Sequence, residues 1–153
     1  MDLGLIMTTA PLLLITHDPS HPLAMMAFRF AKAYLESHIS QKNDNEEGSS
    51  QDTANENDAK LAVFFYGNAA QTANRLRWQS AEITDMTKLW QSLVEEYHLE
   101  LPVCVSTALS RGISDSDNSR RHELIGDNLA AGFSLVGLGE LATLMSSRRL
   151  LQF

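Results

Sequence analysis

Two short runs of apolar residues, uninterrupted by polar side chains, constrain the fold of this chain more than any other feature. Leu12–Ile15 is followed by a polar turn, and Leu61–Tyr66 ends at Gly67. Short apolar runs bounded by turn residues are typical of strands buried on both faces, which occur mainly in parallel sheets. A parallel sheet needs helices on both of its faces, so the two runs predict an α/β fold.

Helical periodicity follows the first of these runs. Apolar residues recur at helical spacing between Leu23 and Leu35, after a cap at Ser20 or His21 and with Pro22 in the first turn. This spacing places the apolar residues on one side of the helix. We therefore expect an amphipathic helix that packs on the sheet.

The rest of the chain repeats the alternation of strand and helix. The clearest helical pattern of the sequence runs to Tyr97, and Thr84 is its expected cap. The elements expected after it are a strand at 101–105, a short helical turn at 106–111, a polar loop at 114–119, a weaker helix ending before 132, a strand at 133–136, a helix at 138–147 and a terminal strand at 150–153. We predict a single three-layer α/β domain, 1–153, with a mainly parallel sheet of about five strands and helices on both faces.

The acidic residues are unevenly distributed along the chain. The 153 residues carry a net charge of −7, but six of the 19 acidic residues lie between 43 and 59, a stretch with no basic residue. The remaining 13 acidic residues nearly balance the 12 basic ones. Residues 41–59 also lack large apolar side chains, so we expect a flexible acidic insertion there. The near-neutral remainder predicts neither direct contact with nucleic acid nor binding to an anionic membrane.

A single cysteine, Cys104, excludes an intrachain disulfide and a cysteine-rich zinc site. This cysteine content fits a reducing compartment, so we expect a cytoplasmic protein. The apolar opening Leu3–Ile15 follows Asp2 instead of basic residues and is interrupted by Pro11. We therefore predict neither a signal peptide nor a membrane span, and Met7 is an alternative start.

Two local motifs suggest a ligand, but both have a simpler explanation. Gly137–Ala142 matches the dinucleotide motif GxGxxA, yet the chain has no room for the ribose-binding acidic residue about 20 positions later. Tight packing between strand and helix explains these glycines better. His17, Asp18 and His21 could coordinate a metal, but two imidazoles and one carboxylate in a turn are a weak signal, and a capping role is favoured. We expect no cofactor and no metal.

Cys104 has two interpretations. It lies in an apolar strand, where a free cysteine usually acts as a small buried hydrophobic residue, and the local pattern alone favours this interpretation. In the other interpretation, Cys104 lies at the carboxyl edge of the sheet, beside unpaired N–H groups of a helix start that stabilise a thiolate. Arg111 could then assist the thiolate.

Several segments occur along the chain in a characteristic order and spacing: Val63–Tyr66, Ala73–Leu76, Leu89–Gln91, Val103–Val105, Ala108–Leu109, Arg111–Gly112, Gly132–Leu135, Gly137–Gly139, Leu141–Ala142 and Gln152–Phe153. From about 11 to 153, apart from the acidic insertion, the chain resembles the DsrE-like sulfur-carrier family. Cys104 falls where this family carries its persulfide-forming cysteine. The chain departs from the family at Thr16–Pro19, which replaces a glycine-containing turn, and in the length of the insertion.

The resemblance implies a sulfurtransferase subunit that accepts sulfane sulfur as a persulfide on Cys104 and passes it to a downstream carrier. The implied pathway is 2-thiouridine modification of the wobble position of tRNA. The implied partners are TusB-like and TusC-like paralogous subunits in a heterohexamer built as a dimer of trimers, a TusA-like sulfur donor and a TusE-like sulfur acceptor. Trp78, Phe133 and Phe153 are candidates for the subunit interface. A DsrE-type carrier in dissimilatory sulfur oxidation and a non-catalytic assembly subunit are the alternatives.

Overall fold

A parallel sheet forms the middle layer of the protein. The computed structural model describes residues 9–43 and 60–153. Within these residues, five strands form one sheet in the order β4-β3-β2-β1-β5, and every neighbouring pair is parallel. The strands are β1 Pro11–Ile15, β2 Ala62–Phe65, β3 Leu101–Cys104, β4 Phe133–Val136 and β5 Arg149–Gln152. The predicted α/β fold with about five parallel strands is therefore confirmed.

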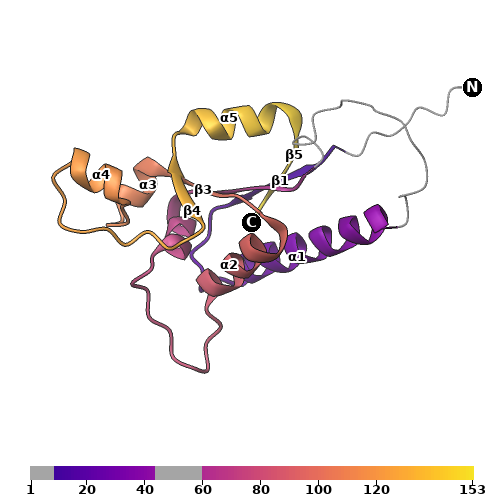
Figure 1. Cartoon of the computed structure of the whole chain (residues 1–153), viewed down its shortest axis with the longest axis horizontal. Helices are drawn as coiled ribbons and strands as arrows, with labels where there is room; N and C mark the ends of the chain where they lie inside the picture. Colours follow the sequence, from indigo (N-terminus) through magenta and orange to yellow (C-terminus); the bar gives the residue numbers. More distant parts are fainter. Residues whose placement is uncertain (1–8, 44–59) are drawn as a thin grey trace, which may run out of the picture.

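Helices cover both faces of this sheet (Figure 1). Helices α1 (Pro22–Asn43) and α2 (Met86–Tyr97) lie side by side on one face, and α5 (Leu138–Ser147) lies on the other. The short helices η1 (Gly67–Ala73), α3 (Val105–Leu109) and α4 (Ser116–Arg121) follow the carboxyl ends of β2 and β3. No helix among the described residues is long and apolar enough to cross a membrane.

The larger part of the core lies between the sheet and the pair α1 and α2. Trp90 of α2 is 1% exposed and lies at its centre. The Trp90 ring makes edge-to-face contacts with Phe28 of α1 and Phe65 of β2, at centroid distances of 5.7 and 5.4 Å. Such contacts add to the free energy of burying the rings, so Trp90 joins two helices and the sheet.

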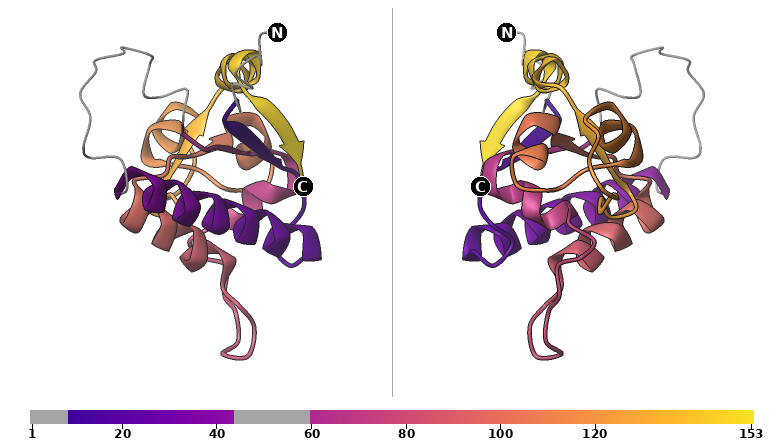
Figure 2. Two further views of the ribbon diagram at one scale, coloured as in Figure 1. Left: turned by 90° about the vertical axis from the view of Figure 1, so that its right-hand side faces the viewer. Right: turned by 90° about the vertical axis from the view of Figure 1, so that its left-hand side faces the viewer.

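The opposite face of the sheet is covered more thinly. Leu12, Phe64 and Cys104 are buried there and form a second, smaller apolar cluster. Leu141 and Leu144 of α5 pack against this cluster, but no side chain of α5 is fully buried. Figure 2 shows α5 alone above this face, whereas two long helices cover the other.

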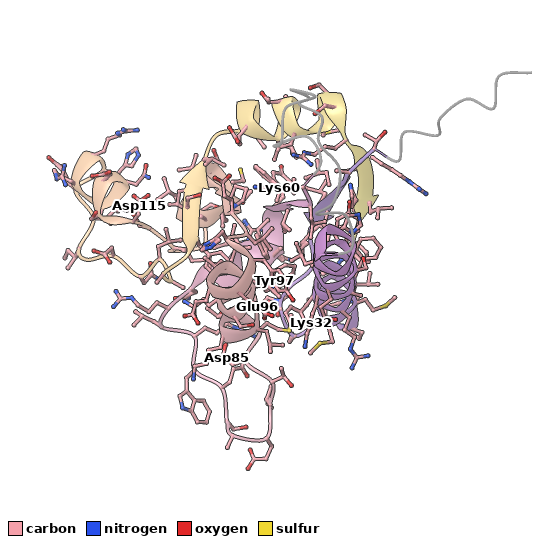
Figure 3. The ribbon with its side chains drawn as sticks, turned by 45° about the vertical axis from the view of Figure 1, so that its right-hand side comes forward. Lys32, Lys60, Asp85, Glu96, Tyr97 and Asp115 are labelled. Carbon is pink, nitrogen blue, oxygen red and sulfur yellow. The ribbon has the colours of Figure 1, made fainter. Side chains whose placement is uncertain are left out.

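Aspartate residues cap two of the helices, and the start of one of them, α2, differs from its predicted position. The cap of α2 is Asp85, not Thr84, because the Asp85 carboxylate accepts hydrogen bonds from the backbone N–H groups of Thr87 and Lys88 at 3.1 and 3.3 Å. Asp115 caps α4 in the same way, through the N–H of Asn118 at 2.8 Å. Figure 3 shows Asp85 and Asp115 at the two helix starts. A carboxylate satisfies the free N–H groups of a first turn and interacts favourably with the helix dipole.

The helix α4 corrects two other expectations. The polar loop predicted at 114–119 is wrong, because helix α4 occupies 116–121. The weaker helix predicted between this loop and Gly132 is wrong as well, since residues 122–132 contain no helix. The reason is that Leu124 and Ile125 are exposed and have no apolar surface on which to pack a helix.

Helix α1 is longer than expected. It extends to Asn43, past the expected start of the insertion at 41. The rest of the predicted flexible insertion, 44–59, lies outside the described residues.

Two glycines offer a matched test of local stability. A Cβ at Gly139, inside α5, meets no heavy atom within 4 Å. Gly139→Ala should therefore raise the free energy of unfolding by about 0.5 kcal/mol, because alanine favours the helix and restricts the unfolded chain. Gly132 has a φ of +87°, and a Cβ there would lie 3.3 Å from Val94. Gly132→Ala should lower the same quantity by about 1 kcal/mol or more. Urea denaturation of both variants measures these changes. Changes of equal sign would contradict the surroundings described here for the two glycines.

Candidate functional site at the end of strand β3

Cys104 lies where the sequence places it, at the carboxyl end of a strand. It is the last residue of β3 and the residue that precedes α3. The alternation of side chains along a strand directs Val103 into the main core and Cys104 into the cluster beneath α5. Cys104 is only 1% exposed. The two interpretations of this cysteine therefore both describe the structure, since the thiol is buried and lies at the carboxyl edge.

The surroundings of the thiol are apolar. Leu12 and Phe64, from the two strands beyond β3, are the other buried members of the cluster. Val136 pairs with Cys104 in the β3–β4 ladder and packs against the same cluster. Water and soluble thiols are excluded from such a site, so a reactive sulfur there is protected from bulk solvent.

Hydrogen bonds order the loops that follow β1 and β2 along this edge. The N–H of Tyr66 donates to the carbonyl of Ile15 at 2.9 Å. The hydroxyl and the N–H of Thr16 both donate to the carbonyl of Phe153, at 3.0 and 2.7 Å. The ends of β1, β2 and β5 are thereby held together beside the end of β3.

Arg111 does not contact the thiol as a hydrogen-bond donor. Its guanidinium donates to the side-chain oxygen of Asn68 at 3.0 and 3.3 Å, and to the carbonyl of Thr107 at 3.1 Å. It also donates to the hydroxyl of Ser110 at 3.3 Å. The sequence suggested that Arg111 could assist the thiolate, whereas in the structure its hydrogen bonds go to η1 and to the C-terminal end of α3.

The turn after β1 does not assemble a metal site. Asp18 accepts hydrogen bonds from the N–H and hydroxyl of Ser20 at 2.9 and 2.7 Å. Partial burial raises the pKa of the Asp18 carboxyl, but these two hydrogen bonds and the charge of Arg77 lower it below the usual value of an aspartate. The rings of His17 and His21 stack at 4.2 Å, and His21 caps α1 through the N–H of Leu23. Among the described residues, no three His, Cys, Asp or Glu side chains converge on a common point.

The glycines of the GxGxxA motif lie in open space. Gly137 precedes α5 and Gly139 lies in its first turn, and a Cβ added to either residue meets nothing within 4 Å. The expected tight packing between strand and helix is therefore wrong for these two residues. Their open surroundings also leave the adjoining Leu138 half exposed.

The aromatic residues expected at a subunit interface divide into three environments. Trp78 is 82% exposed in the loop between η1 and α2, which projects from the domain in Figure 2. Phe133 is 7% exposed and packs edge to face on Phe65, so its assignment to an interface is wrong. Phe153 is half-buried and packs against the main core near Phe30.

A group of hydrogen bonds around Asn128 corresponds to no motif in the sequence. The amide of Asn128 donates to the side-chain oxygen of Asn74 at 3.1 Å and to the carbonyl of Gly112 at 2.9 Å. Its oxygen accepts from the N–H of Ser114 at 2.9 Å. These bonds join the end of η1 to the loop after α3. Since the partners are 14 to 54 residues apart in the chain, no local pattern predicts them.

Comparisons with known proteins agree with this geometry. Residues 11–153 match the sequence profile of the DsrE/DsrF-like family. Sulfurtransferase TusD of Erwinia tasmaniensis is 42% identical over 93 residues, which cover 60% of this chain and 73% of the relative. Sulfurtransferase TusD of Proteus mirabilis is 34% identical over 133 residues, 85% of this chain and 86% of the relative. The crystal structure of the ychN protein from E. coli has the same fold, with a TM-score of 0.66 at 18% identity over 94% of this chain and 98% of that chain.

These findings bear directly on the class of protein. Both relatives carry the name sulfurtransferase, which confirms the activity class that the sequence predicts. The profile match extends from the first residue of β1 to the end of the chain and includes the acidic stretch between α1 and β2. The chain belongs to the DsrE/DsrF-like family.

Proposed function

We propose that this chain carries sulfane sulfur as a persulfide on Cys104 and passes it to a second protein. The observation that carries the proposal is the position of the single cysteine, at the junction of β3 and α3. Ligands and reacting groups of parallel α/β sheets collect at the carboxyl ends of the strands. Membership of the DsrE/DsrF-like family and the names of the TusD relatives support sulfur as the transferred atom.

The transfer requires only one thiol on this chain. The Cys104 thiol gives up the proton that the departing donor sulfur finally takes up, and its thiolate attacks the outer sulfur of a donor persulfide. A bond forms between Sγ of Cys104 and that sulfur, while the S–S bond of the donor breaks and its electron pair leaves with the donor sulfur, which takes up a proton. An acceptor thiolate then repeats the displacement on the Cys104 persulfide and restores the thiol. No net oxidation or reduction occurs.

The surroundings of Cys104 suit a persulfide that must survive between two partners. The apolar cluster with Leu12 and Phe64 excludes soluble thiols that would otherwise consume the outer sulfur. Cys104 is also the only cysteine of the chain. A second nearby thiol would attack the persulfide, form a disulfide and release sulfide, and this chain has none to do so.

The pathway we propose is a Tus sulfur relay that ends in 2-thiouridine at the wobble position of tRNA. In this relay a TusA-like protein donates sulfur to Cys104 and a TusE-like protein accepts it. The proposed location is the cytoplasm, where thiols remain reduced. The chain itself need not bind tRNA, because its charges outside 43–59 are nearly balanced.

We further propose that TusB-like and TusC-like subunits complete the assembly as a dimer of trimers. Exposed apolar side chains support the proposal. They are Leu138 and Met145 on α5 and Trp78 in the projecting loop. Expressed alone, the chain should self-associate or be poorly soluble, whereas co-expression with both paralogues should yield a defined complex. Light scattering measures both. A monodisperse monomer that transfers sulfur at full rate without partners would contradict the assembly.

Sulfur loading tests the proposed function directly. The wild-type chain, co-expressed with its paralogous subunits, is incubated with a TusA-like protein that carries a persulfide. Mass spectrometry of the peptide containing Cys104 should show a gain of about 32 Da, the mass of one sulfur atom, and a reductant should remove it. Addition of a TusE-like protein should discharge the sulfur. A chain that gains no mass at Cys104 would rule out the proposed role.

A further inference from the structure

We propose that Arg111 is a positioning residue for sulfur transfer, which holds the backbone of Cys104 through hydrogen bonds to Asn68 and Thr107. The proposal rests on the proposed function of Cys104 and adds to it a residue that does not touch the sulfur. We call the set Asn68, Arg111 and Thr107 the Arg111 clamp.

The Arg111 clamp is a continuous series of hydrogen bonds that ends at Cys104. Asn68, in the first turn of η1, accepts from Nη2 and Nε of Arg111 at 3.0 and 3.3 Å. Nη1 of Arg111 donates to the carbonyl of Thr107 at 3.1 Å. The hydroxyl of Thr107 donates to the carbonyl of Cys104 at 3.1 Å. Helix η1, which follows β2, is thus joined to the end of β3 through α3.

The local structure explains why this junction needs support. Helix α3 has five residues, too few to be stable without tertiary contacts. The last carbonyl groups of a helix have no partner within it, and the carbonyl of Thr107 accepts from both Arg111 and the hydroxyl of Ser110 at 3.1 Å. At the N-terminal end of α3, the side chain of Cys104 makes no capping hydrogen bond. The Arg111 clamp therefore adds side-chain hydrogen bonds that hold α3 against η1.

The shape of arginine suits both partners of the clamp. The guanidinium is a rigid plane with five N–H donors. The edge with Nε and Nη2 donates to Asn68, while Nη1 donates to Thr107. A lysine ammonium is a single point and cannot hold both acceptors in this geometry. Arg111 is half-buried; its bond to Thr107 is partly shielded from water, whereas its bonds to Asn68 are exposed.

The position of the Cys104 backbone matters for the reaction because the thiol is almost fully buried. A donor sulfur has to meet Sγ of Cys104 in one particular alignment, at an edge formed by β3 and the loops beside it. Displacements of about 1 Å in a reacting group can reduce a rate by about 100-fold. Loss of the clamp should thus reduce the rate of transfer and leave the recognition of the donor unchanged.

The test measures sulfur loading of Cys104 in the assembled complex at increasing concentrations of a persulfidated TusA-like donor. We expect Arg111→Ala to lower the rate at saturating donor about tenfold, with the half-saturating concentration unchanged. Arg111→Lys should lose nearly as much. Asn68→Asp keeps an oxygen acceptor for the fork and should retain the wild-type rate. Wild-type rates in both Arg111 variants, or a change only in the half-saturating concentration, would overturn the proposal.

Two control variants separate positioning from general stability. Arg120→Ala removes an exposed arginine that pairs with Asp117 and should load sulfur at the wild-type rate. Leu93→Val lowers stability from within α2, on the opposite side of the sheet, and should also retain the rate. If Leu93→Val reproduces the loss seen in Arg111→Ala at a similar drop in Tm, the clamp has only a structural role and the proposal fails.

A second measurement does not depend on the proposed function. The rate at which iodoacetamide alkylates Cys104 reports how firmly the junction of β3 and α3 covers the thiol. This rate should rise several-fold in Arg111→Ala and in Asn68→Ala, and should remain unchanged in Arg120→Ala. If the wild-type chain takes up no sulfur while alkylation changes as expected, the proposed function fails and the clamp stands. If alkylation does not change, the clamp fails.

Discussion

Cys104→Ser is expected to abolish sulfur loading while the chain remains folded. Serine keeps the size and shape of the side chain, but its hydroxyl is not ionised near neutral pH and cannot attack a persulfide sulfur at a useful rate. The expected gain of about 32 Da on the peptide containing residue 104 should therefore disappear completely. Intact mass and peptide mass spectrometry measure this loss.

The fold of this variant needs its own control because residue 104 is buried. A serine hydroxyl in the apolar cluster with Leu12 and Phe64 costs about 1–3 kcal/mol if it finds no hydrogen-bond partner. Cys104→Ala avoids that cost and leaves only a small cavity, so it should be folded and equally unable to carry sulfur. Sulfur bound to either variant, or bound elsewhere in the wild-type chain, would contradict the assignment of Cys104.

Trp90→Ala is expected to lower the free energy of unfolding by about 3–5 kcal/mol, the usual cost of removing a large buried aromatic side chain. Trp90 is 1% exposed and packs edge to face on Phe28 and Phe65. Its removal leaves a cavity where α1, α2 and the sheet meet. Urea denaturation measures the change, and co-expression with the paralogous subunits keeps the variant measurable if the isolated chain does not fold.

The other tryptophan of the chain is the matched control. Trp78 is 82% exposed, so Trp78→Ala should change the free energy of unfolding by no more than about 0.5 kcal/mol. Under the proposed assembly, Trp78→Ala should instead weaken the association of the subunits, which light scattering detects. A loss of stability in Trp78→Ala as large as that in Trp90→Ala would contradict the core described here.

The two faces of the sheet have different consequences for function. The face under α1 and α2 holds most of the buried aromatic side chains and supplies most of the stability. The face under α5 holds Cys104 in a small cluster whose cover has no fully buried residue. The sheet therefore separates Cys104, the residue proposed to react, from the residues that supply most of the stability.

The sequence by itself determined the order of strands and helices and the position of Cys104 along them. Strands buried on both faces appear as continuous apolar runs such as Leu12–Ile15, and α2 shows its apolar spacing directly. These signals are local, so one sequence is sufficient to find them. The strand that ends near Cys104 and the helical turn that follows it were predictable for the same reason.

Only the tertiary structure decided what surrounds Cys104. Side chains alternate along β3, but the sequence does not say which face α5 covers, and hence not that the thiol lies beneath it. The choice of Asp85 over Thr84 as a cap depends on backbone geometry at the helix start. The bond between Asn68 and Arg111 joins residues 43 positions apart. Contacts of this kind depend on how the strands are ordered in the sheet, and for that reason the sequence pointed to Arg111 but assigned it the wrong contact.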